Sequence, residues 1–384
     1  MKRTPISPFM KAVFLLSLLV IGASMTSPAG ALRSPSVDNS VPQLIVSNDD
    51  ISASLRITTL PFRLTVTSFE ATEAVDDPAS TKCGLNPGLA TVWYKYRPST
   101  NVMVHMDTIG SNYDTYMAVW TGTRGSLTEV ACNDDASTTV FASAINITLK
   151  AGVLYYIEVA QFNGSSADTT ERVSAKLLPE VAATVGATHV FRLVRIVTRT
   201  YKSNGVQDGF VMESTETSNV GLIKDTTLPT IRVGDDAKKR QYRSILSFDT
   251  SALPNTAVVT YAKIKLKLES FVGPTNIFTT FGKVRVDIRK PYFGKGVGLE
   301  SIDFQAAASR GLVGAFGTAP VSGWYVAQLN KTSFPHFNVT GYTQFRLRFT
   351  KDDDNDFAAD HVRFYSGNSG DTNKPVLILR YYVP

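Results

Sequence analysis

The stretch AKIKLKLES, residues 262–270, decides the fold, because its side chains alternate between apolar and charged. Ile264, Leu266 and Leu268 share one side of an extended segment, and lysines occupy the positions between them. Since neighbouring side chains of a β-strand point to opposite faces, this period of two predicts a strand with one buried face and one wet face. One-sided burial of this kind is typical of antiparallel sheets.

The same alternation recurs along both halves of the chain. It is found in KVRVDIRK (283–290) and QFRLRF (344–349), and again in NVMVHMDT (101–108) and GVLYYIEVAQF (152–162). Turn-forming runs such as NDDAS and NGSSAD separate the alternating segments, and we expect helix only as a turn or two within 301–311. The sequence therefore predicts an all-β protein built from β-sandwich, jelly-roll-like domains.

A change in composition at residues 181–187 predicts a domain boundary. The segment PEVAATVGAT, 179–188, contains small, weakly polar residues and lacks strand alternation. The chain is also longer than one hydrophobic core usually serves. We expect two sandwich domains in tandem, residues 48–180 and 188–384, with 181–187 as the linker and 32–47 as a flexible lead-in.

The first 31 residues have the parts of a secretory signal. Lys2, Arg3 and Lys11 precede the apolar run 12–21, and small residues follow up to 29–31. The run is shorter than the roughly 20 residues that span a bilayer, which favours a cleaved signal peptide over a membrane anchor. We predict a secreted protein, extracellular or at the cell surface, with no membrane span in the mature chain.

Removal of the signal would lower the formal net charge from +6 to +3, because the signal carries three basic and no acidic residues. So small a net charge gives no support to general nucleic-acid binding. We therefore expect no nucleic-acid partner.

Cys83 and Cys132 are the whole cysteine content of the chain. Two thiols in an exported protein most simply form one disulfide, whereas a structural zinc site built on cysteine would need more ligands. We predict a bridge between them that closes a loop of about 50 residues.

Cys132 opens a polar run in which Asn133, Asp134 and Asp135 follow. The two carboxylates are adjacent, so in an extended segment they point to opposite faces, which argues against an acid and base pair. Two interpretations stay open. One is an Asx-type turn, and the other is a calcium site with Asp114 as a further ligand.

The acidic run KDDDNDFAAD, 351–360, carries Asp352, Asp354 and Asp356 at alternating positions. It does not fit the EF-hand loop, which needs glycine at the sixth and glutamate at the twelfth position, where this chain has phenylalanine and arginine. Crowded carboxylates repel one another unless water or a cation compensates them. Either a solvated hairpin tip or a calcium site that includes Asp360 would meet this condition.

Blocks of the first half recur in order in one known family. They are NDDISASLRITTLPF, ATEAVDDPASTKCG, TVWYKYRP, DTIGSNYDTYMAVWTG, SLTEVACNDDA and AGVLYYIEVAQFNG. Over residues 48–178 the chain resembles the bacterial pre-peptidase C-terminal (PPC-like) β-sandwich family. The resemblance implies a non-catalytic secreted module, often appended to hydrolases and sometimes stabilised by calcium, although no peptidase precedes it in this sequence.

Blocks of the second half point to another family. They are DGFVMESTETSNVG, IRVGDDAKKRQYRSILSFDTSALP, YAKIKLKL, GWYVAQLN and TQFRLRFTKDDDNDFAADHVRFYSGNSGDTNKPVLILRYY. Over residues 188–384 the chain resembles the DNRLRE and carbohydrate-binding-module type of jelly roll. The resemblance implies polysaccharide ligands, including anionic ones, and a structural ion near the start of the domain, for which Asp208 and Glu213 are candidates.

Basic side chains on the wet strand faces are the first candidates for ligand contacts. They are Lys263, Lys265, Lys267, Lys283, Arg285, Arg289, Arg346 and Arg348. On neighbouring strands they would form a cationic patch suited to carboxylated or sulfated polysaccharide. The other interpretation is that they keep the sheet soluble and its edges unpaired.

Four aromatic residues could stack on sugar rings if they are exposed on loops. Tyr292 and Phe293 lie in a turn-rich context that favours this role, whereas Trp324 and Tyr325 have less turn character around them. Aromatic side chains are more often core residues, because each buries a large area.

Motifs for catalysis are absent: the chain has no G-x-S-x-G, no H-E-x-x-H and no phosphate-binding glycine loop. We predict a non-enzymatic protein that binds extracellular or cell-surface polysaccharide, with an anionic glycan favoured and calcium as a candidate structural ion. The alternative is a structural or adhesive surface protein that binds a protein partner or itself through exposed strand edges. A lyase or hydrolase without a recognisable motif is the third interpretation.

Overall fold

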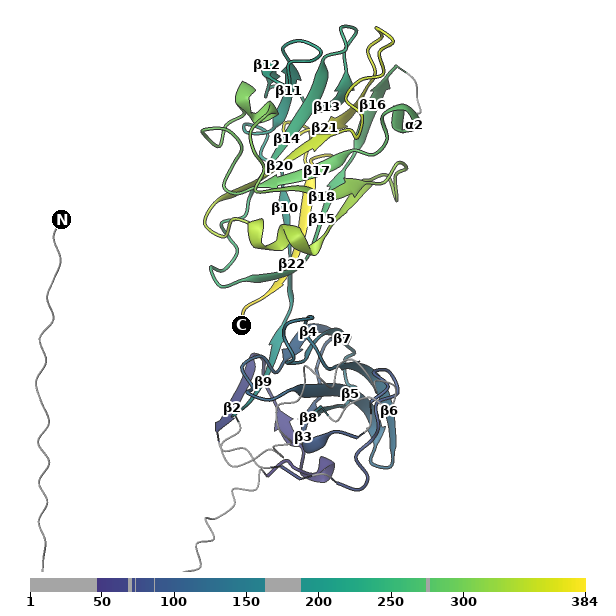
Figure 1. The fold of residues 1–384 in the computed structure, drawn as a ribbon, viewed down its shortest axis with the longest axis vertical. Coiled ribbons are helices and arrows are strands. Elements are labelled where there is room, and N and C mark those ends of the chain that lie inside the picture. The colour runs from purple at the N-terminus through teal and green to yellow at the C-terminus, as the bar shows by residue number, and fades with distance from the viewer. Residues whose placement is uncertain (1–46, 68–70, 73, 86, 163–187, 274–276) are drawn as a thin grey trace, which may run out of the picture. The chain divides into compact units, whose positions relative to one another are not determined.

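A computed structural model describes most of the chain (Figure 1). The described residues are 47–384 without 68–70, 73, 86, 163–187 and 274–276. The predicted signal peptide, nearly all of the lead-in and the predicted linker lie outside them. No helix in the described part of the chain is long and apolar enough to span a membrane.

The described residues are almost entirely β, which confirms the predicted fold class. The strands form three sheets, of five, four and thirteen strands. The helical elements are short: η1 (Ile51–Ala53), α2 (Ile277–Phe281), η2 (Ser301–Phe304) and η3 (Lys331–His336). The expected helical turn within 301–311 is thus present as η2.

Two of the sheets lie in the first half of the chain and share one core. The five-stranded sheet has the order β1 (Leu55–Ile57), β3 (Leu89–Tyr96), β8 (Tyr155–Gln161), β5 (Thr115–Thr123), β6 (Ser126–Asn133). The four-stranded sheet has the order β2 (Phe62–Thr67), β9 (Thr188–Arg195), β4 (Val102–Asp107), β7 (Ala144–Leu149). Side chains of both sheets, such as Tyr94, Val104 and Phe191, meet in one buried cluster, as in a sandwich.

The disulfide between Cys83 and Cys132 is present, which confirms the predicted pairing. Its Cα atoms are 6.0 Å apart. The bridge ties the end of β6 to the segment that precedes β3, next to the buried rings of Trp93 and Trp120.

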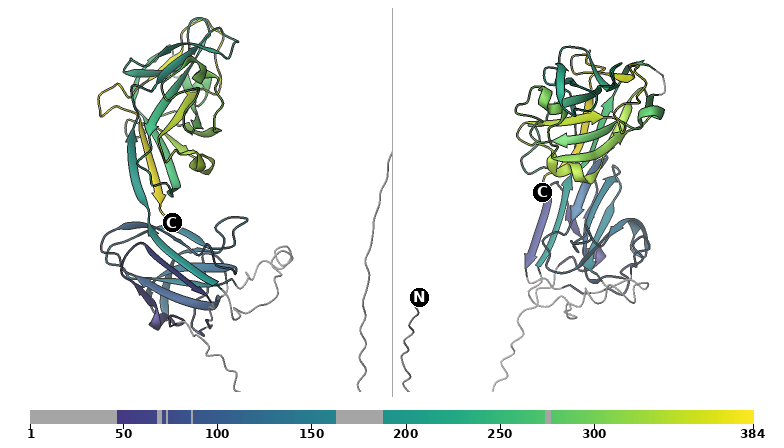
Figure 2. Two further views of the ribbon diagram at one scale, coloured as in Figure 1. Left: turned by 90° about the vertical axis from the view of Figure 1, so that its left-hand side faces the viewer. Right: turned by 45° about the horizontal axis from the view of Figure 1, so that its top comes forward.

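The third sheet contains thirteen strands that belong to the second half of the chain. Its main path is β10 (Val197–Lys202), β22 (Val376–Tyr382), β15 (Val258–Leu266), β19 (Tyr325–Leu329), β18 (Arg310–Phe316), β17 (Arg285–Arg289), β20 (Tyr342–Arg348), β14 (Gln241–Asp249), β13 (Thr230–Asp235), β21 (His361–Tyr365), β16 (Leu268–Val272). Off this path, β11 (Gly209–Glu213) pairs with β14 and with β12 (Gly221–Asp225). Figure 2 shows these strands as layers, with the yellow β22 beside the teal β10.

The alternation has the predicted effect over residues 262–266, but 262–270 is not one strand, because β15 ends at Leu266 and β16 begins at the partly buried Leu268. Ile264 and Leu266 are fully buried, while Lys263 and Lys265 are partly exposed. The buried side chains join those of β14, β17, β20 and β22 in one large core cluster. Burial of each aliphatic side chain contributes about 1.5–3 kcal/mol, so the alternating strands make a large favourable contribution to the stability of this sheet.

The strands of the first two sheets extend further along the sequence than expected. We expected residue 188 to open the second domain, but β9 pairs with β2 and β4 of the first half. The reason is that Phe191 and Leu193 point into the core of that half. The thirteen-stranded sheet starts with β10, after Ile196. Because Leu44–Pro384 clusters as one compact unit, the organisation in two domains stays a prediction.

Glu158 of β8 is a fully buried carboxyl, and it gives a prediction about pH. Its Oε2 accepts a hydrogen bond from Trp120 Nε1 at 2.8 Å, and burial raises its pKa from 4.5 to about 8. Above about pH 4.5 the unfolded state therefore loses a proton that the folded state keeps. The contribution of Glu158 to the free energy of unfolding is complete below that pH and is lost as the pH rises towards 8. Between pH 5 and pH 8, the urea concentration at the unfolding midpoint should decrease less for Glu158→Gln than for the unmodified protein.

The matched control for this experiment is Glu269→Gln, which removes a carboxylate at an exposed position. It should leave the pH dependence of the midpoint as in the unmodified protein. If Glu158→Gln leaves that dependence equally unchanged, Glu158 is ionised in the folded state and the prediction is wrong.

Candidate functional site

The predicted basic rows do not form one continuous surface. Lys265 lies on β15, whereas Arg285 and Arg348 lie side by side on β17 and β20. In the sheet, β19 and β18 separate β15 from β17. The apolar sides of these strands contribute to one core cluster, so the basic sides face away from it in two groups.

Arg346 is buried, with only 7% of its surface exposed, so its expected place on a solvent face is wrong. Its guanidinium donates to the Asp287 carboxylate at 3.0 Å and to the carbonyls of Asp303, Phe304 and Ala306 at 3.1, 3.1 and 2.7 Å. These carbonyls belong to the segment 290–309, which covers β20 on the face of the sheet that carries Arg346. Arg346 is therefore part of the scaffold.

The same segment explains the position of Phe293. Its ring is fully buried and packs with Phe304 in a small separate cluster, so the expectation of an exposed stacking ring is wrong. The Arg346 guanidinium lies 4.8 Å from the ring centre. Tyr292 is partly exposed, and its carbonyl accepts a hydrogen bond from Arg289 Nε at 3.1 Å.

Asp287 compensates the buried arginine charge. It is 2% exposed and accepts from Arg346, from Arg348 Nε at 3.4 Å and from the backbone N–H of Leu312 at 3.0 Å. These donors hold the pKa of Asp287 below its usual value despite burial. An acidic residue between two apolar positions of β17 is the only signal in the sequence that could have indicated this partner.

Lys283 and Arg285 lie beside a shallow hollow of about 310 Å³. Its lining also includes Leu312, Gly314 and Thr350, and Arg285 Nε donates to Thr350 Oγ1 at 3.0 Å. This hollow holds basic side chains and no aromatic ring. It could accept an anionic group but offers no ring on which a sugar could stack.

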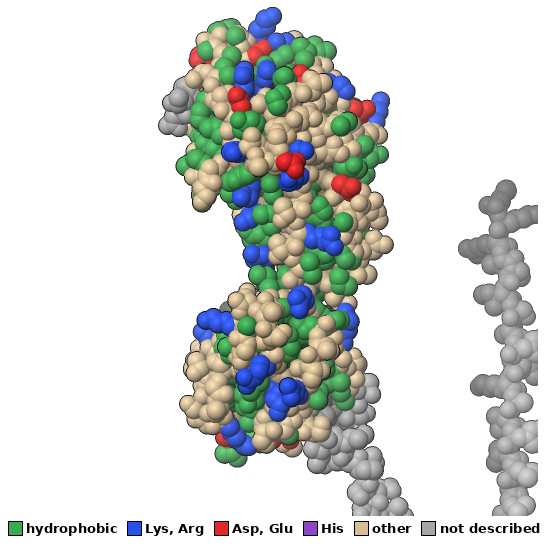
Figure 3. Space-filling view, turned by 180° about the vertical axis from the view of Figure 1, so that it is seen from behind, with side chains coloured by type: hydrophobic (Ala, Val, Ile, Leu, Met, Phe, Trp, Pro, Cys, Tyr) green, Lys and Arg blue, Asp and Glu red, His purple; other side chains and the backbone are tan. Residues whose placement is uncertain are grey.

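The other basic group lies on β15 and its neighbours, where cations and aromatic rings alternate. We call Tyr261, Lys263, Lys265, Trp324 and Arg380 the β15 face. Lys265 Nζ lies 4.6 Å from the centre of the Trp324 ring, and the Arg380 guanidinium lies 4.7 Å from that of Tyr261. Each of the five side chains is partly exposed. Lys and Arg interspersed with hydrophobic side chains are visible on the side of the molecule seen in Figure 3.

Local geometry produces this face. The register of β15 against β22 shifts between Val259 and Tyr261, and after the shift Tyr261 lies directly opposite Arg380. Such a bulge turns side chains on the bulged strand relative to its partner. A short turn that ends with the bridge between Val321 and Trp324 then leads into β19, the neighbour of β15 on the other side.

The cations of the β15 face lack acidic partners in the described part of the chain. No ion pair there involves Lys263, Lys265 or Arg380, unlike Arg346 and Arg348. Just beyond the face, Lys267 Nζ donates to Asn373 Oδ1 at 2.8 Å, so that lysine is already engaged. The sequence indicated the lysines, but Tyr261 and Arg380 were missed because cross-strand pairing cannot be read from one strand.

Among the predicted metal residues, Asn133 to Asp135 form a turn. Asn133 Nδ2 donates to the Asp135 carbonyl at 2.9 Å, and Asp134 Oδ1 accepts from the Asp135 N–H at 3.0 Å. These bonds tie the side chains to the backbone of the same segment, and the Asx-type turn and the calcium site both stay predictions. Among the described residues, one group of three side chains of the Asp, Glu, Cys or His type brings its ligand atoms within 4.8 Å of one another. Asp114, Asp134 and Asp135 do not belong to this group.

Asp208 and Glu213 are both buried but do not form a common site. Asp208 accepts from Ser203 Oγ at 2.7 Å and from the Gly367 N–H at 2.8 Å, and burial raises its pKa to about 6. Glu213 instead accepts from the backbone N–H groups of Asn219 and Gln241. Each carboxylate thus has its own donors.

The acidic loop is different, because there the structure brings predicted residues together. Asp354 and Asp356 form the group mentioned above with Asp360, whereas Asp352 does not belong to it. The loop joins β20 to β21.

Comparison with known proteins adds no identity. No family model matches the chain, and no curated protein matches it. A structure of the infectious bursal disease virus Gx strain matches at 10% identity over 84% of this chain and 76% of that chain, with a TM-score of 0.18. A likeness this weak carries no argument about fold or function. The resemblances to the PPC-like and DNRLRE families therefore stay predictions.

Proposed function

We propose that this protein is a secreted, non-catalytic binding protein that recognises acidic polysaccharide at the β15 face. The observation that carries the proposal is the presence of three cations that have no acidic partner among the described residues, beside two partly exposed rings. The predicted signal peptide and the resemblance of the second half to carbohydrate-binding modules agree with it.

The chemistry of the β15 face matches an acidic sugar chain in two ways. Carboxylate or sulfate groups would pair with Lys263, Lys265 and Arg380, and Arg can hold a carboxylate through two hydrogen bonds. The partly exposed rings of Tyr261 and Trp324, each with a cation over one face, would add apolar contact to a pyranose ring bound beside them. Since a single exposed ion pair contributes only about 0–1 kcal/mol, binding should depend on several pairs together and weaken as salt is added.

Affinity electrophoresis in gels that contain polygalacturonate tests this proposal. The unmodified protein should be retarded at low salt, and Lys263→Ala/Lys265→Ala should lose most of the retardation because two of three cations are gone. Dextran, which is neutral, should retard neither. Heparin in a third gel separates a preference for sulfate from one for carboxylate.

The matched control is Lys238→Ala/Lys351→Ala, which removes the same charge at two exposed positions outside β15 and the strands that pair with it. It should be retarded like the unmodified protein. If Lys283→Ala/Arg285→Ala abolishes retardation while the β15 variant keeps it, the hollow and not the β15 face is the site. If no acidic glycan retards the unmodified protein, the proposed function is wrong.

One observation favours a second candidate function, adhesion through a strand edge. Strand β12 pairs only with β11 in the described part of the chain, and Leu222 and Ile223 on it are 58% and 48% exposed. Exposed apolar edge strands are prone to pair with another chain. Absence of glycan binding together with association that increases with protein concentration would favour this candidate over the first.

A further inference from the structure

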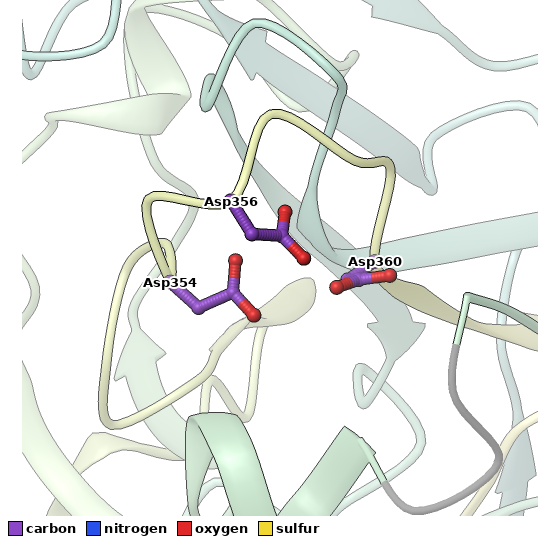
Figure 4. Close-up of side chains that lie close together, drawn as sticks. All are labelled: Asp354, Asp356 and Asp360. Carbon is purple, nitrogen blue, oxygen red and sulfur yellow. The ribbon is translucent and has the colours of Figure 1, made fainter.

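Three carboxylates converge in the loop between β20 and β21. Oxygens of Asp354, Asp356 and Asp360 lie within 4.8 Å of one another, and Figure 4 shows the three side chains turned towards a common point. Asp360 is only 2% exposed, and its Oδ1 has no hydrogen-bond partner among the described residues. An ionised carboxylate that is buried without a partner is costly, so the arrangement calls for a compensating positive charge.

A fourth carboxylate, from a distant part of the sequence, borders this group. Asp235 ends β13 and is 1% exposed. Its N–H donates to the Asp360 carbonyl at 2.9 Å, and its Oδ1 accepts from the Asp360 N–H at 3.2 Å. Its Oδ2 is buried and has no partner in the described part of the chain. An unpartnered carboxylate oxygen at the end of β13 thus lies on a residue that is hydrogen-bonded to Asp360 of the converging group.

Among the described residues, Lys239 reaches the acidic loop, where its Nζ donates to Asn355 Oδ1 at 3.3 Å, but it does not pair with the converging carboxylates. No ion pair among the described residues involves any of the four carboxylates, and nearby Lys239 pairs with Glu216 instead. Carboxylates this close together repel one another, and a bound cation would relieve that repulsion.

The backbone is shaped to admit the Asp360 carboxylate. Gly273, just after β16, has a φ of 84°, a conformation that favours glycine. A Cβ at this position would overlap Asp360 Oδ1. The site therefore joins the end of β13, the end of β16 and the acidic loop.

We propose that Asp235, Asp354, Asp356 and Asp360 form a binding site for a calcium ion, which fastens the acidic loop to the ends of β13 and β16. Hard carboxylate oxygens are the ligands that calcium prefers, and calcium accepts the irregular geometry that a loop provides, whereas magnesium demands a near-ideal octahedron. The group contains no thiolate and no imidazole, which soft or borderline metals prefer. This inference is independent of the proposed glycan binding.

Isothermal titration of the EDTA-treated, dialysed protein with calcium chloride tests the site. We expect saturable binding, and calcium should also raise the thermal midpoint, since an ion that binds only the folded state stabilises it. Asp356→Asn removes one ligand from an exposed position and should weaken calcium binding at least tenfold without impairing folding. Asp360→Asn should abolish binding, and magnesium should bind more weakly than calcium.

The matched control is Asp352→Asn, which removes a carboxylate from the same loop but outside the converging group. It should bind calcium within twofold of the unmodified protein. If Asp352→Asn weakens binding as much as Asp356→Asn, calcium only screens a charged loop and the assigned ligand set is wrong. Absence of saturable binding to the unmodified protein would also overturn the proposal.

Affinity electrophoresis with EDTA and with calcium keeps the two proposals apart. We expect the retardation by polygalacturonate to persist for Asp356→Asn, whose β15 face is intact. Lys263→Ala/Lys265→Ala should retain calcium binding, because its acidic loop is intact. Failure of one proposal would therefore leave the other standing.

Discussion

Replacement of Asp287 by alanine is expected to lower the free energy of unfolding by about 3–5 kcal/mol, because it leaves the Arg346 guanidinium buried without its counter-charge. The pair is enclosed, with exposed fractions of 9% and 3% for the two side chains. The backbone N–H of Leu312 would also lose its acceptor. Urea denaturation followed by circular dichroism measures the effect.

The double variant Asp287→Ala/Arg346→Met is the control for this prediction. It removes both charges and replaces the arginine by an apolar side chain of similar length, so it should be more stable than Asp287→Ala alone. A loss below about 1 kcal/mol in Asp287→Ala would contradict the assignment of this pair as buried scaffold.

The same pair predicts how the stability of the protein changes in acid. The pKa of Asp287 is lower in the folded state than its usual value of 3.8. The unfolded state therefore takes up a proton first as the pH falls, so the stabilisation is complete above about pH 4 and is lost below it.

Loss of the disulfide is the second large effect that we expect. Cys83→Ser/Cys132→Ser should lower the stability of the first-half sandwich by about 4 kcal/mol, because the bridge closes a loop of about 50 residues and so limits the unfolded chain. Both sulfurs also pack beside buried aromatic rings. The double variant avoids a single free thiol, and its denaturation should be compared with that of the unmodified protein.

Treatment of the unmodified protein with a reducing agent should reproduce the result for the double variant. If reduction lowers the denaturation midpoint but the serine variant does not, the effect comes from the reagent. If neither treatment changes the midpoint, the bridge does not limit the unfolded state as assumed.

The alternating pattern was enough to predict strands and their buried sides, as β15 demonstrates. It could not predict the burial of Arg346 and Phe293. That burial depends on the path of the segment 290–309 after β17. The alternating pattern of a strand does not indicate which other segment packs on its polar face. The exposed charge expected there is consequently a buried pair with Asp287.

For the acidic loop, the sequence placed Asp354 and Asp356 close together but not Asp235. That residue lies 125 positions before Asp360, and only the pairing of β13 with β21 brings the two side by side. Spacing rules describe ligands that one loop supplies, so a site assembled by sheet pairing escapes them. Tyr261 and Arg380 of the β15 face were missed for the same physical reason.

The pairing of β10 with β22 has a consequence for how the protein folds. Arg199 Nε donates to Tyr381 Oη across 182 residues of chain, and β22 is the sole partner of β10 in the described structure. During synthesis β10 must therefore wait, unpaired, until β22 emerges from the ribosome. Topologies dominated by such distant pairings fold slowly, in milliseconds to seconds, so completion of this sheet should be a late event in folding.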